Sequence, residues 1–454
     1  MIGPRSQSPT FRYLGAGAVL SLISLTFLLF GRPSYLGSEW NSGPYLLKDS
    51  SSGSPVRSEK CAGAEPGAGP TNGGATENST WEFNVHRDGN NHGLSESQCL
   101  SAFPKLFVEL ERTAEFWAAN DGIAYKDVDD VARGGGVDGN GNGLVGAAIK
   151  DGELYILDYG PQPYTFTRGK ATLHSLHRAL SAYPDRHTLP DIEFVLTTDD
   201  FSTPTSTGNR QSPIWSYTKR PDAPDTGIWL MPDFGYWAWP EVAQVGEYKD
   251  VRRRISTIDE GLPFSAKKKQ LLWRGSVAAN PEIRNGLLEA ARGKTWGSLK
   301  EVKWDDDQQA NLMPIEDHCT YAFLAHTEGR SYSGRGKYLL NCRSVLISHK
   351  PHWLEAHHAA LIPSGLDANY VQVERDWSDL ERKVEFLLDN PAAAERIAEN
   401  AARTFRDRYL TPAAESCYWR YLVNMYGGVS GFVPVLEGKG KGRGVKFESW
   451  VLGV

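Results

Sequence analysis

From residue 265 onward, short apolar runs alternate with segments whose apolar residues recur at helical spacing. This alternation predicts parallel β-strands joined by crossover helices, because parallel neighbours need a connection long enough to hold a helix. The strands are expected at 270–273, 322–326, 345–348 and 370–373, and the helices at 281–292, from Tyr338 onward and at 378–389. This part of the chain is therefore expected to form an α/β fold with a parallel sheet.

The preceding region combines helix and strand patterns. A helix is expected over 100–119 and a β-hairpin over 144–157. A buried strand over 191–198 is followed by Asp199 and Asp200. Ligands and catalytic groups of open α/β sheets gather beyond strand C-termini, so these carboxylates are candidate site residues. A helix cap or turn is the alternative role.

The N-terminal segment has the features of a membrane anchor. Residues 13–30 form an uncharged apolar run of about the length that crosses a bilayer. We expect a transmembrane signal anchor there, a cytoplasmic tail at 1–12 and a lumenal remainder, with a cleaved signal peptide as the alternative. Residues 31–95 are rich in Gly, Ser and Pro, which predicts a disordered stem. The stem carries an N-glycosylation sequon at Asn78.

Charge and cysteine content narrow the function classes. The net charge of −6 argues against nucleic acid as a partner. None of the five cysteines stands in a CxxC or zinc-like spacing, which favours disulfides in an oxidising compartment.

Three sequence features resemble metal-binding sites but lack part of the pattern that such a site needs. The glycine-rich tract 134–143 copies the first half of a calcium loop, but Ile149 stands where that loop needs a glutamate. The acidic run 305–307 is expected to be a solvated loop. Metal-ligand spacing is also missing among His318, His326, His357 and His358, so no metal is expected.

The loop 327–340 concentrates groups that suit phosphate. It carries Arg330, Arg335 and Lys337 together with two serines and three glycines. A guanidinium offers a planar fork that matches phosphate oxygens, and glycines let the backbone approach a ligand closely. We predict that this loop binds a diphosphate-bearing ligand; a solvated loop that leads into a helix is the alternative.

The order of the motifs resembles glycosyltransferase family 90, which includes Rumi-like protein O-glucosyltransferases and fungal capsule-associated proteins. The resemblance covers residues 191–421, and its motifs are 271–276, the loop 327–340, 344–347, 353–354, 369–373 and 376–380. It implies a GT-B-like fold, with two Rossmann-like domains that face a cleft. The implied parts are an acceptor-side domain at 96–240, a UDP-sugar-binding domain at 241–410, a helix returning to the first domain at 411–432 and a tail at 433–454.

The resemblance also implies a pocket that neutralises the diphosphate of a nucleotide sugar without a metal or other cofactor. The residues it places there are Arg274, Ser276, Ser333, Arg335 and Lys337. Pairing of Arg274 with a core carboxylate, and a helix start at Lys337, are the alternatives.

The family's catalytic base is an aspartate in an Arg-Asp-Tyr-Pro context. Asp200 aligns best with that aspartate, and Asp199 stands where the family has arginine. This departure leaves the choice between Asp199 and Asp200 open.

The resemblance further implies two disulfides. Cys319 and Cys342 match one family pair, and Cys417 matches a cysteine whose partner lies near the start of the domain, for which Cys99 is the candidate. Cys61 is left over in the stem.

The resemblance therefore implies an inverting glycosyltransferase, a single-pass type II protein of the Golgi or endoplasmic reticulum membrane. It would move glucose or xylose from UDP-glucose or UDP-xylose to a hydroxyl on a glycan or protein. Two alternatives stay open: an inactive lumenal carbohydrate-binding or scaffold protein, and a metal-dependent enzyme of the GT-A type.

Overall fold

A computed structural model describes residues 81–134, 143–162, 164–202, 212–222, 224–242, 245–303, 311–436 and 443–454, all within the unit Glu77–Val454. The expected anchor at 13–30, most of the stem with Asn78, Cys61 and the acidic run 305–307 lie outside these residues. In the described part, no helix is long and apolar enough to cross a membrane.

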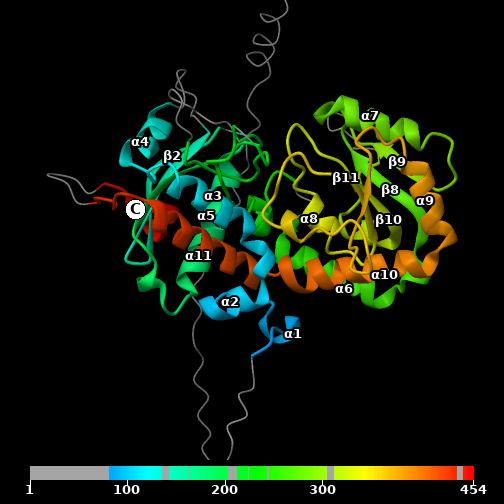
Figure 1. Cartoon of the computed structure of the whole chain (residues 1–454), viewed down its shortest axis with the longest axis horizontal. Helices are drawn as coiled ribbons and strands as arrows, with labels where there is room; N and C mark the ends of the chain where they lie inside the picture. Colours follow the sequence, from blue (N-terminus) through cyan, green and yellow to red (C-terminus); the bar gives the residue numbers. More distant parts are fainter. Residues whose placement is uncertain are drawn as a thin grey trace, which may run out of the picture. The chain divides into compact units, whose positions relative to one another are not determined.

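The C-terminal half is built on a parallel sheet of five strands; the alternating pattern predicted a parallel sheet and four of these strands, but not the one at Gly297–Glu301. Figure 1 shows its helices packed around the strands. The strand order is β12 (Val371–Val373), β11 (Val345–His349), β10 (Tyr321–His326), β8 (Lys268–Gly275) and β9 (Gly297–Glu301). The helices are α6 (Tyr248–Gly261), α7 (Pro281–Ala290), the single turn α8 (Gly336–Leu339), α9 (Leu380–Asp389) and α10 (Pro391–Ala401), which continues as a π-helix over Ala402–Tyr409. The helix expected from Tyr338 onward is wrong, because α8 ends at Leu339.

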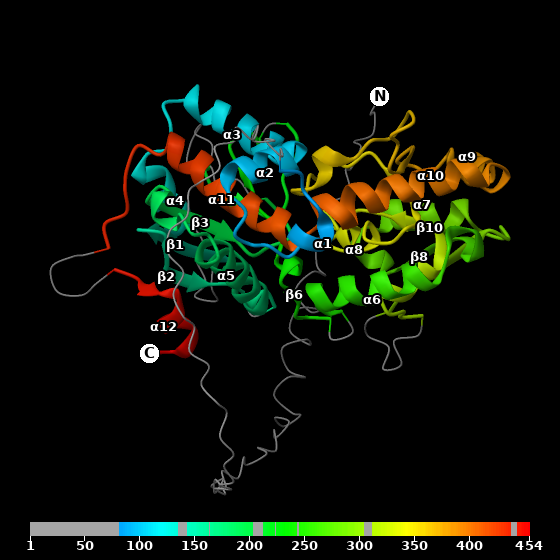
Figure 2. The ribbon, with the colours of Figure 1, turned by 90° about the horizontal axis from the view of Figure 1, so that it is seen from below.

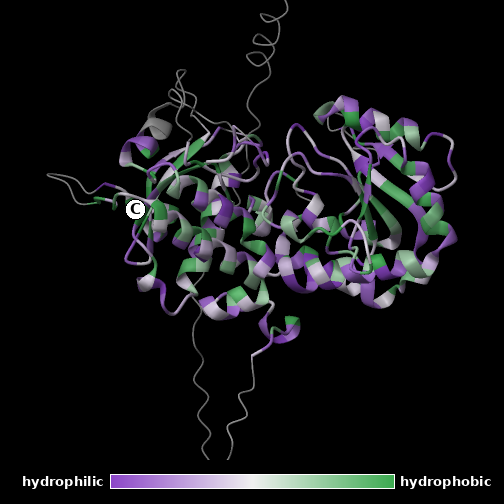
Figure 3. Cartoon of the chain, in the orientation of Figure 1, coloured by the Kyte–Doolittle hydropathy of each residue, from purple (hydrophilic) through white to green (hydrophobic). Residues whose placement is uncertain are grey.

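Both faces of this sheet are buried, because successive side chains of a strand point to opposite faces. Leu271 and Trp273 of β8 belong to one hydrophobic cluster and Leu272 to another. Phe323 and Leu324 of β10 divide in the same way. The strands accordingly stand out as hydrophobic in Figure 3.

The N-terminal half contains a sheet of six strands, and this sheet is mixed. The predicted hairpin is confirmed: β1 and β2 pair antiparallel, and Asp151 and Gly152 at their turn have φ of 52° and 73°. β3 pairs antiparallel with β1 but parallel with β4, so the expectation of a parallel, Rossmann-like half holds only for the strands from β3 to β5. The order is β13 (Val445–Lys446), β2 (Glu153–Gly160), β1 (Leu144–Lys150), β3 (Ile192–Thr197), β4 (Trp215–Ser216) and β5 (Trp229–Leu230), and β6 (Ala238–Trp239) pairs with β7 (Gly246–Glu247) separately.

Helix α11 (Pro412–Val429) packs against α2 (Glu96–Ala102), α3 (Val108–Ala118) and α5 (Phe166–Ser181) of the N-terminal half. The single helix expected over 100–119 is wrong, because Pro104 interrupts it and begins a 3-10 turn between α2 and α3. Both predicted disulfides are confirmed: Cys99–Cys417 joins α2 to α11, and Cys319–Cys342 joins the 3-10 helix Glu316–Thr320 before β10 to the segment after α8.

Part of the expected stem and part of the C-terminal tail are folded. Residues 81–95 were assigned to the stem, yet Trp81 and Phe83 pack against the core and α1 (Val85–Asp88) follows them, capped by Asn84. In the tail, β13 pairs with β2, and α12 (Phe447–Leu452) packs beside it (Figure 2). Helix α4 (Tyr125–Gly134) completes the set.

Candidate active site

A cavity of about 290 Å³ is lined by residues of both halves. Arg168 and Asp200 contribute from the N-terminal half, and Arg274, Ser276 and Arg335 contribute from the C-terminal half. Ser333 lines the same cavity, so of the six predicted site residues only Lys337 is not part of its wall.

Asp200 follows β3 and is held beside α5. Nη1 of Arg168 lies 2.8 Å from Oδ1 of Asp200, and the Asp200 side chain is 45% exposed. Its backbone carbonyl accepts a hydrogen bond from Oγ of Ser331 in the 327–340 loop. Arg168 also lies 3.4 Å from Glu241 and over the ring of Phe234. The carboxylate is therefore fixed in place yet open to the cavity.

Asp199 occupies a different environment. It accepts a hydrogen bond from Tyr164 Oη at 3.3 Å and does not line the cavity. Burial raises the pKa of its carboxyl group. Geometry thus favours Asp200 over Asp199 as the carboxylate that reaches a ligand.

The cavity wall also carries four guanidinium groups without an acidic partner among the described residues: Arg274, Arg284, Arg335 and the exposed Arg330. Arg274 donates to the carbonyls of Trp273 and Ser298, which hold it at the end of β8.

Arg284, on α7, donates to the carbonyls of Glu328 and Ser276 at 3.1 and 2.6 Å. Nε of Arg335 is buried without a hydrogen-bond partner among the described residues.

Burial destabilises these positive charges. It lowers the pKa of Arg284 to about 10 and, together with the nearby charge of Arg284, that of Arg335 to about 9. Burial likewise lowers the pKa of Arg274. Clustered cations on a poorly solvated wall repel one another, so an anion that binds between them lowers the free energy of the site. The planar fork of each guanidinium group matches the geometry of phosphate oxygens.

Lys337 is paired inside the protein and, unlike the other predicted site residues, does not line the cavity. Its side chain is 1% exposed, and Nζ lies 2.8 Å from the Asp233 carboxylate. It also donates to the Gly334 carbonyl at 2.9 Å. The pair fastens the arginine-bearing loop to residues 233–235, where a Cβ added to Gly235 would lie 2.5 Å from Nζ.

His318 was not predicted to line the site. It lies in the 3-10 helix Glu316–Thr320, is 4% exposed and contributes to the cavity wall. Its Nδ1 lies 3.1 Å from the Pro314 carbonyl, which can only accept, so Nδ1 carries the ring proton. Burial lowers the pKa of His318 to about 3, and Nε2 has no hydrogen-bond partner among the described residues.

Arg168 and Arg284 also belong to the site, and neither had been assigned to it. Arg284 lies just beyond the 271–276 motif, but its residue type alone does not distinguish a ligand contact from a surface charge. Arg168 and His318 carried no local signal, because their roles depend on partners distant in sequence.

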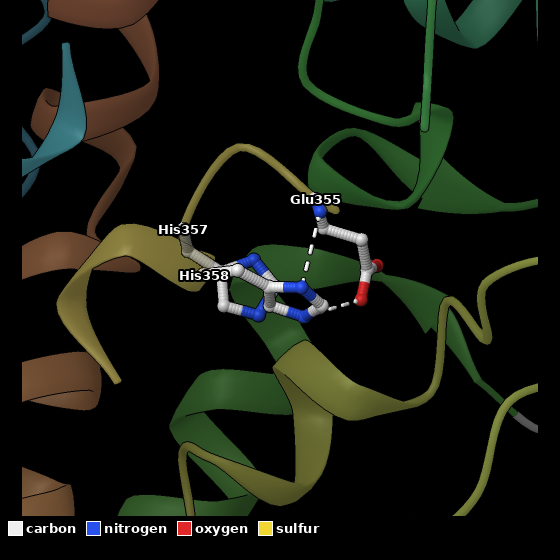
Figure 4. A group of neighbouring side chains, drawn as sticks. All are labelled: Glu355, His357 and His358. Carbon is white, nitrogen blue, oxygen red and sulfur yellow. Dashed lines mark hydrogen bonds and ion pairs between the residues drawn. The ribbon is translucent and has the colours of Figure 1, made fainter. Parts of the chain in front are cut away.

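A second cluster brings together side chains of metal-ligand type, Glu355, His357 and His358 (Figure 4). Nδ1 of His358 accepts from the Glu355 backbone N–H at 3.1 Å, and its Nε2 lies 3.0 Å from the Glu355 carboxylate. Both nitrogens of His358 are thus engaged, which leaves Glu355 and His357 as potential donors. Two ligands are fewer than a protein zinc site uses, so the cluster is better explained as a buried hydrogen-bonded pair.

Comparisons with known proteins match the chain to one family. The family model described as Glycosyl transferase family 90 matches residues 103–440. Protein O-glucosyltransferase 1 of Homo sapiens is 24% identical over 256 residues, which cover 52% of this chain and 62% of that protein. O-glucosyltransferase rumi of Drosophila melanogaster is 26% identical over 260 residues, with 53% and 61% covered. O-glucosyltransferase LpsA of Dichelobacter nodosus is 26% identical over 179 residues, with 39% and 54% covered. The chain thus matches less than two thirds of the length of each of these relatives.

Proposed function

Because this chain belongs to glycosyl transferase family 90, we propose that it moves glucose or xylose from a UDP-sugar to a hydroxyl group on a glycan or protein, with inversion. The observation that carries the proposal is a single cavity lined both by Asp200 and by Arg274, Arg284 and Arg335, whose guanidinium groups lack acidic partners among the described residues. The names of the similar proteins support glucose as the transferred sugar.

The arginines of the cavity wall would bind the donor. Arg274, Arg284 and Arg335 would bind the diphosphate oxygens, and Ser276 and Ser333 would add hydroxyl donors. As the bond from the anomeric carbon to the diphosphate oxygen breaks, UDP leaves with the electron pair, and the fixed positive charges stabilise it. These residues carry the charge that a divalent cation supplies elsewhere, so we propose that the donor site needs no metal.

Asp200 would act on the acceptor as the general base. The acceptor oxygen attacks the anomeric carbon on the face away from the diphosphate, and its proton passes to the Asp200 carboxylate. A single displacement of this kind inverts the anomeric configuration. Arg168 acts as a positioning residue, because its ion pair sets the direction of the carboxylate.

The two sheets, with a cavity lined from both halves, support a GT-B-like arrangement. The apolar segment 13–30 supports a signal anchor, with the catalytic part in the lumen of the Golgi or endoplasmic reticulum. Both disulfides fit an oxidising compartment.

Thermal unfolding of the full chain in EDTA tests the donor site. We expect UDP, UDP-glucose or UDP-xylose to raise the melting temperature above that of the same buffer, and uridine to leave it unchanged, because ligands that bind the native state stabilise it. A rise that requires a divalent cation would support the metal-dependent alternative. No rise with any UDP-sugar, with or without a cation, would support the alternative of a protein that binds other carbohydrates.

A further inference from the structure

His318 combines three properties that suit it to recognise a ligand. It lines the cavity, it is 4% exposed, and its Nε2 has no hydrogen-bond partner among the described residues. Leaving a buried polar atom without a partner costs free energy. A ligand that supplies the missing partner recovers that cost, whereas a ligand that cannot supply it does not.

The hydrogen bond to Pro314 decides what kind of partner fits. Because Nδ1 donates to the Pro314 carbonyl, Nε2 of the neutral ring holds a lone pair and can only accept. The partner must therefore present an N–H or O–H. The bond spans four residues within one short segment, so the ring is oriented before a ligand arrives.

The surroundings of His318 favour a flat ring over a polyhydroxylated group. The cavity wall near it in sequence is apolar, and the guanidinium wall lies close enough for Arg335 and Arg274 to act on the ring electrostatically. The apolar lining residues are Val302, Leu312, Met313 and Ile315. A nucleobase packs its faces on such side chains and presents polar groups only at its edge.

We infer that His318 recognises the uracil base of the donor, with Nε2 accepting a hydrogen bond from the imide N3–H. This inference rests on the proposed function and deepens it. Cytosine has a lone pair at N3, which would face the lone pair of Nε2, so the contact selects uracil over cytosine. A methyl group on N3 of uracil removes the same donor without changing the diphosphate.

Binding of four diphosphates to the full chain tests the inference: UDP, 3-methyl-UDP, CDP and 2′-deoxy-UDP. We expect 3-methyl-UDP and CDP to bind at least about 10-fold more weakly than UDP, because each leaves the buried acceptor unpaired. 2′-Deoxy-UDP reports on the ribose hydroxyl as an alternative donor. Equal binding of UDP and 3-methyl-UDP to the unmodified chain would overturn the inference.

Two variants connect the discrimination to this residue. His318→Leu removes the acceptor at similar volume, so it should bind UDP and 3-methyl-UDP equally. His318→Gln keeps an oxygen acceptor and should still prefer UDP, and it serves if the leucine variant does not fold. The assignment would be overturned if His318→Leu still bound UDP more tightly than 3-methyl-UDP. It would also be overturned if His318→Leu lost only a preference for UDP over 2′-deoxy-UDP. If the unmodified chain binds no uridine diphosphate at all, the proposed function itself fails.

Discussion

Asp200 is the residue on which turnover should depend. It is the carboxylate at the cavity, whereas Asp199 contacts Tyr164 and lies off the cavity wall. We expect Asp200→Asn to lower kcat about 100-fold or more, because a general base contributes about 10²–10⁴-fold. UDP should still stabilise this variant, since Arg274, Arg284 and Arg335 are unchanged. Asp199→Asn is the matched control, and a larger loss of kcat in it than in Asp200→Asn would reverse the assignment.

Arg335 and Lys337 are two residues apart but should respond to substitution in opposite ways. Arg335→Gln removes a half-buried cation that has no acidic partner among the described residues, so the free energy of unfolding measured in urea should change little. The Kd for UDP should rise about 10-fold or more, because a hydrogen bond to a charged group contributes about 1.5–3 kcal/mol. Arg292→Gln, whose side chain is 74% exposed and does not line the cavity, is the control.

Lys337→Met should destabilise the protein instead. It leaves the Asp233 carboxylate, 4% exposed, without its cation. Removal of one partner of a buried ion pair costs about 3–5 kcal/mol, which urea unfolding measures. A Lys337→Met variant with unchanged stability but lost UDP binding would restore the role predicted from the sequence.

At the scale of elements, the segment before α2 is attached to α11. His92 forms a hydrogen bond with Ser416 at 2.7 Å, and burial lowers the pKa of His92 to about 4. Between about pH 6.5 and 4 the unfolded chain therefore binds a proton that the folded chain does not, and stability falls as the pH falls through this window. Across this window, the free energy of unfolding of His92→Gln should fall by about 3 kcal/mol less than that of the parent chain. Urea unfolding at each pH measures this difference. Parallel pH curves for the two proteins would contradict this.

The two disulfides close loops of very different length. Cys99–Cys417 spans 318 residues and Cys319–Cys342 spans 23. If a crosslink acts mainly on the entropy of the unfolded chain, loss of the first should cost about 6 kcal/mol and loss of the second about 3 kcal/mol. Unfolding of Cys99→Ser/Cys417→Ser and Cys319→Ser/Cys342→Ser by urea tests the ranking. A reversed order would show that local packing, and not loop closure, dominates.

For the whole molecule, the net charge and the charge of the cavity have opposite signs. The chain carries a net charge of −6, yet the cavity gathers arginines. If the local cluster governs donor binding, the Kd for UDP should rise between about 50 and 500 mM salt, because screening weakens the attraction. A Kd that falls with salt would indicate that repulsion by the net negative charge dominates, and that the diphosphate lies away from the arginine wall.

The sequence by itself was sufficient for features that depend on local pattern. Strand and helix periodicity predicted the parallel strands β8, β10, β11 and β12, though not β9, and the Asp-Gly turn predicted the β1–β2 hairpin. The resemblance to the family led to Asp200, Arg274 and the correct cysteine pairs. Even local reasoning missed the break at Pro104 and the folded residues 81–95, where a few aromatic side chains outweigh a polar composition.

Only the tertiary structure decided which side chains meet, because burial and ion pairing depend on partners far apart in the chain. Lys337 meets Asp233 from 104 residues away, which removes its charge from the cavity wall. Arg168 contacts Asp200 across 32 residues, and this contact distinguishes Asp200 from Asp199. A lysine or aspartate has the same letter whether its partner is a ligand or another side chain, and only the packed chain determines which of the two it contacts.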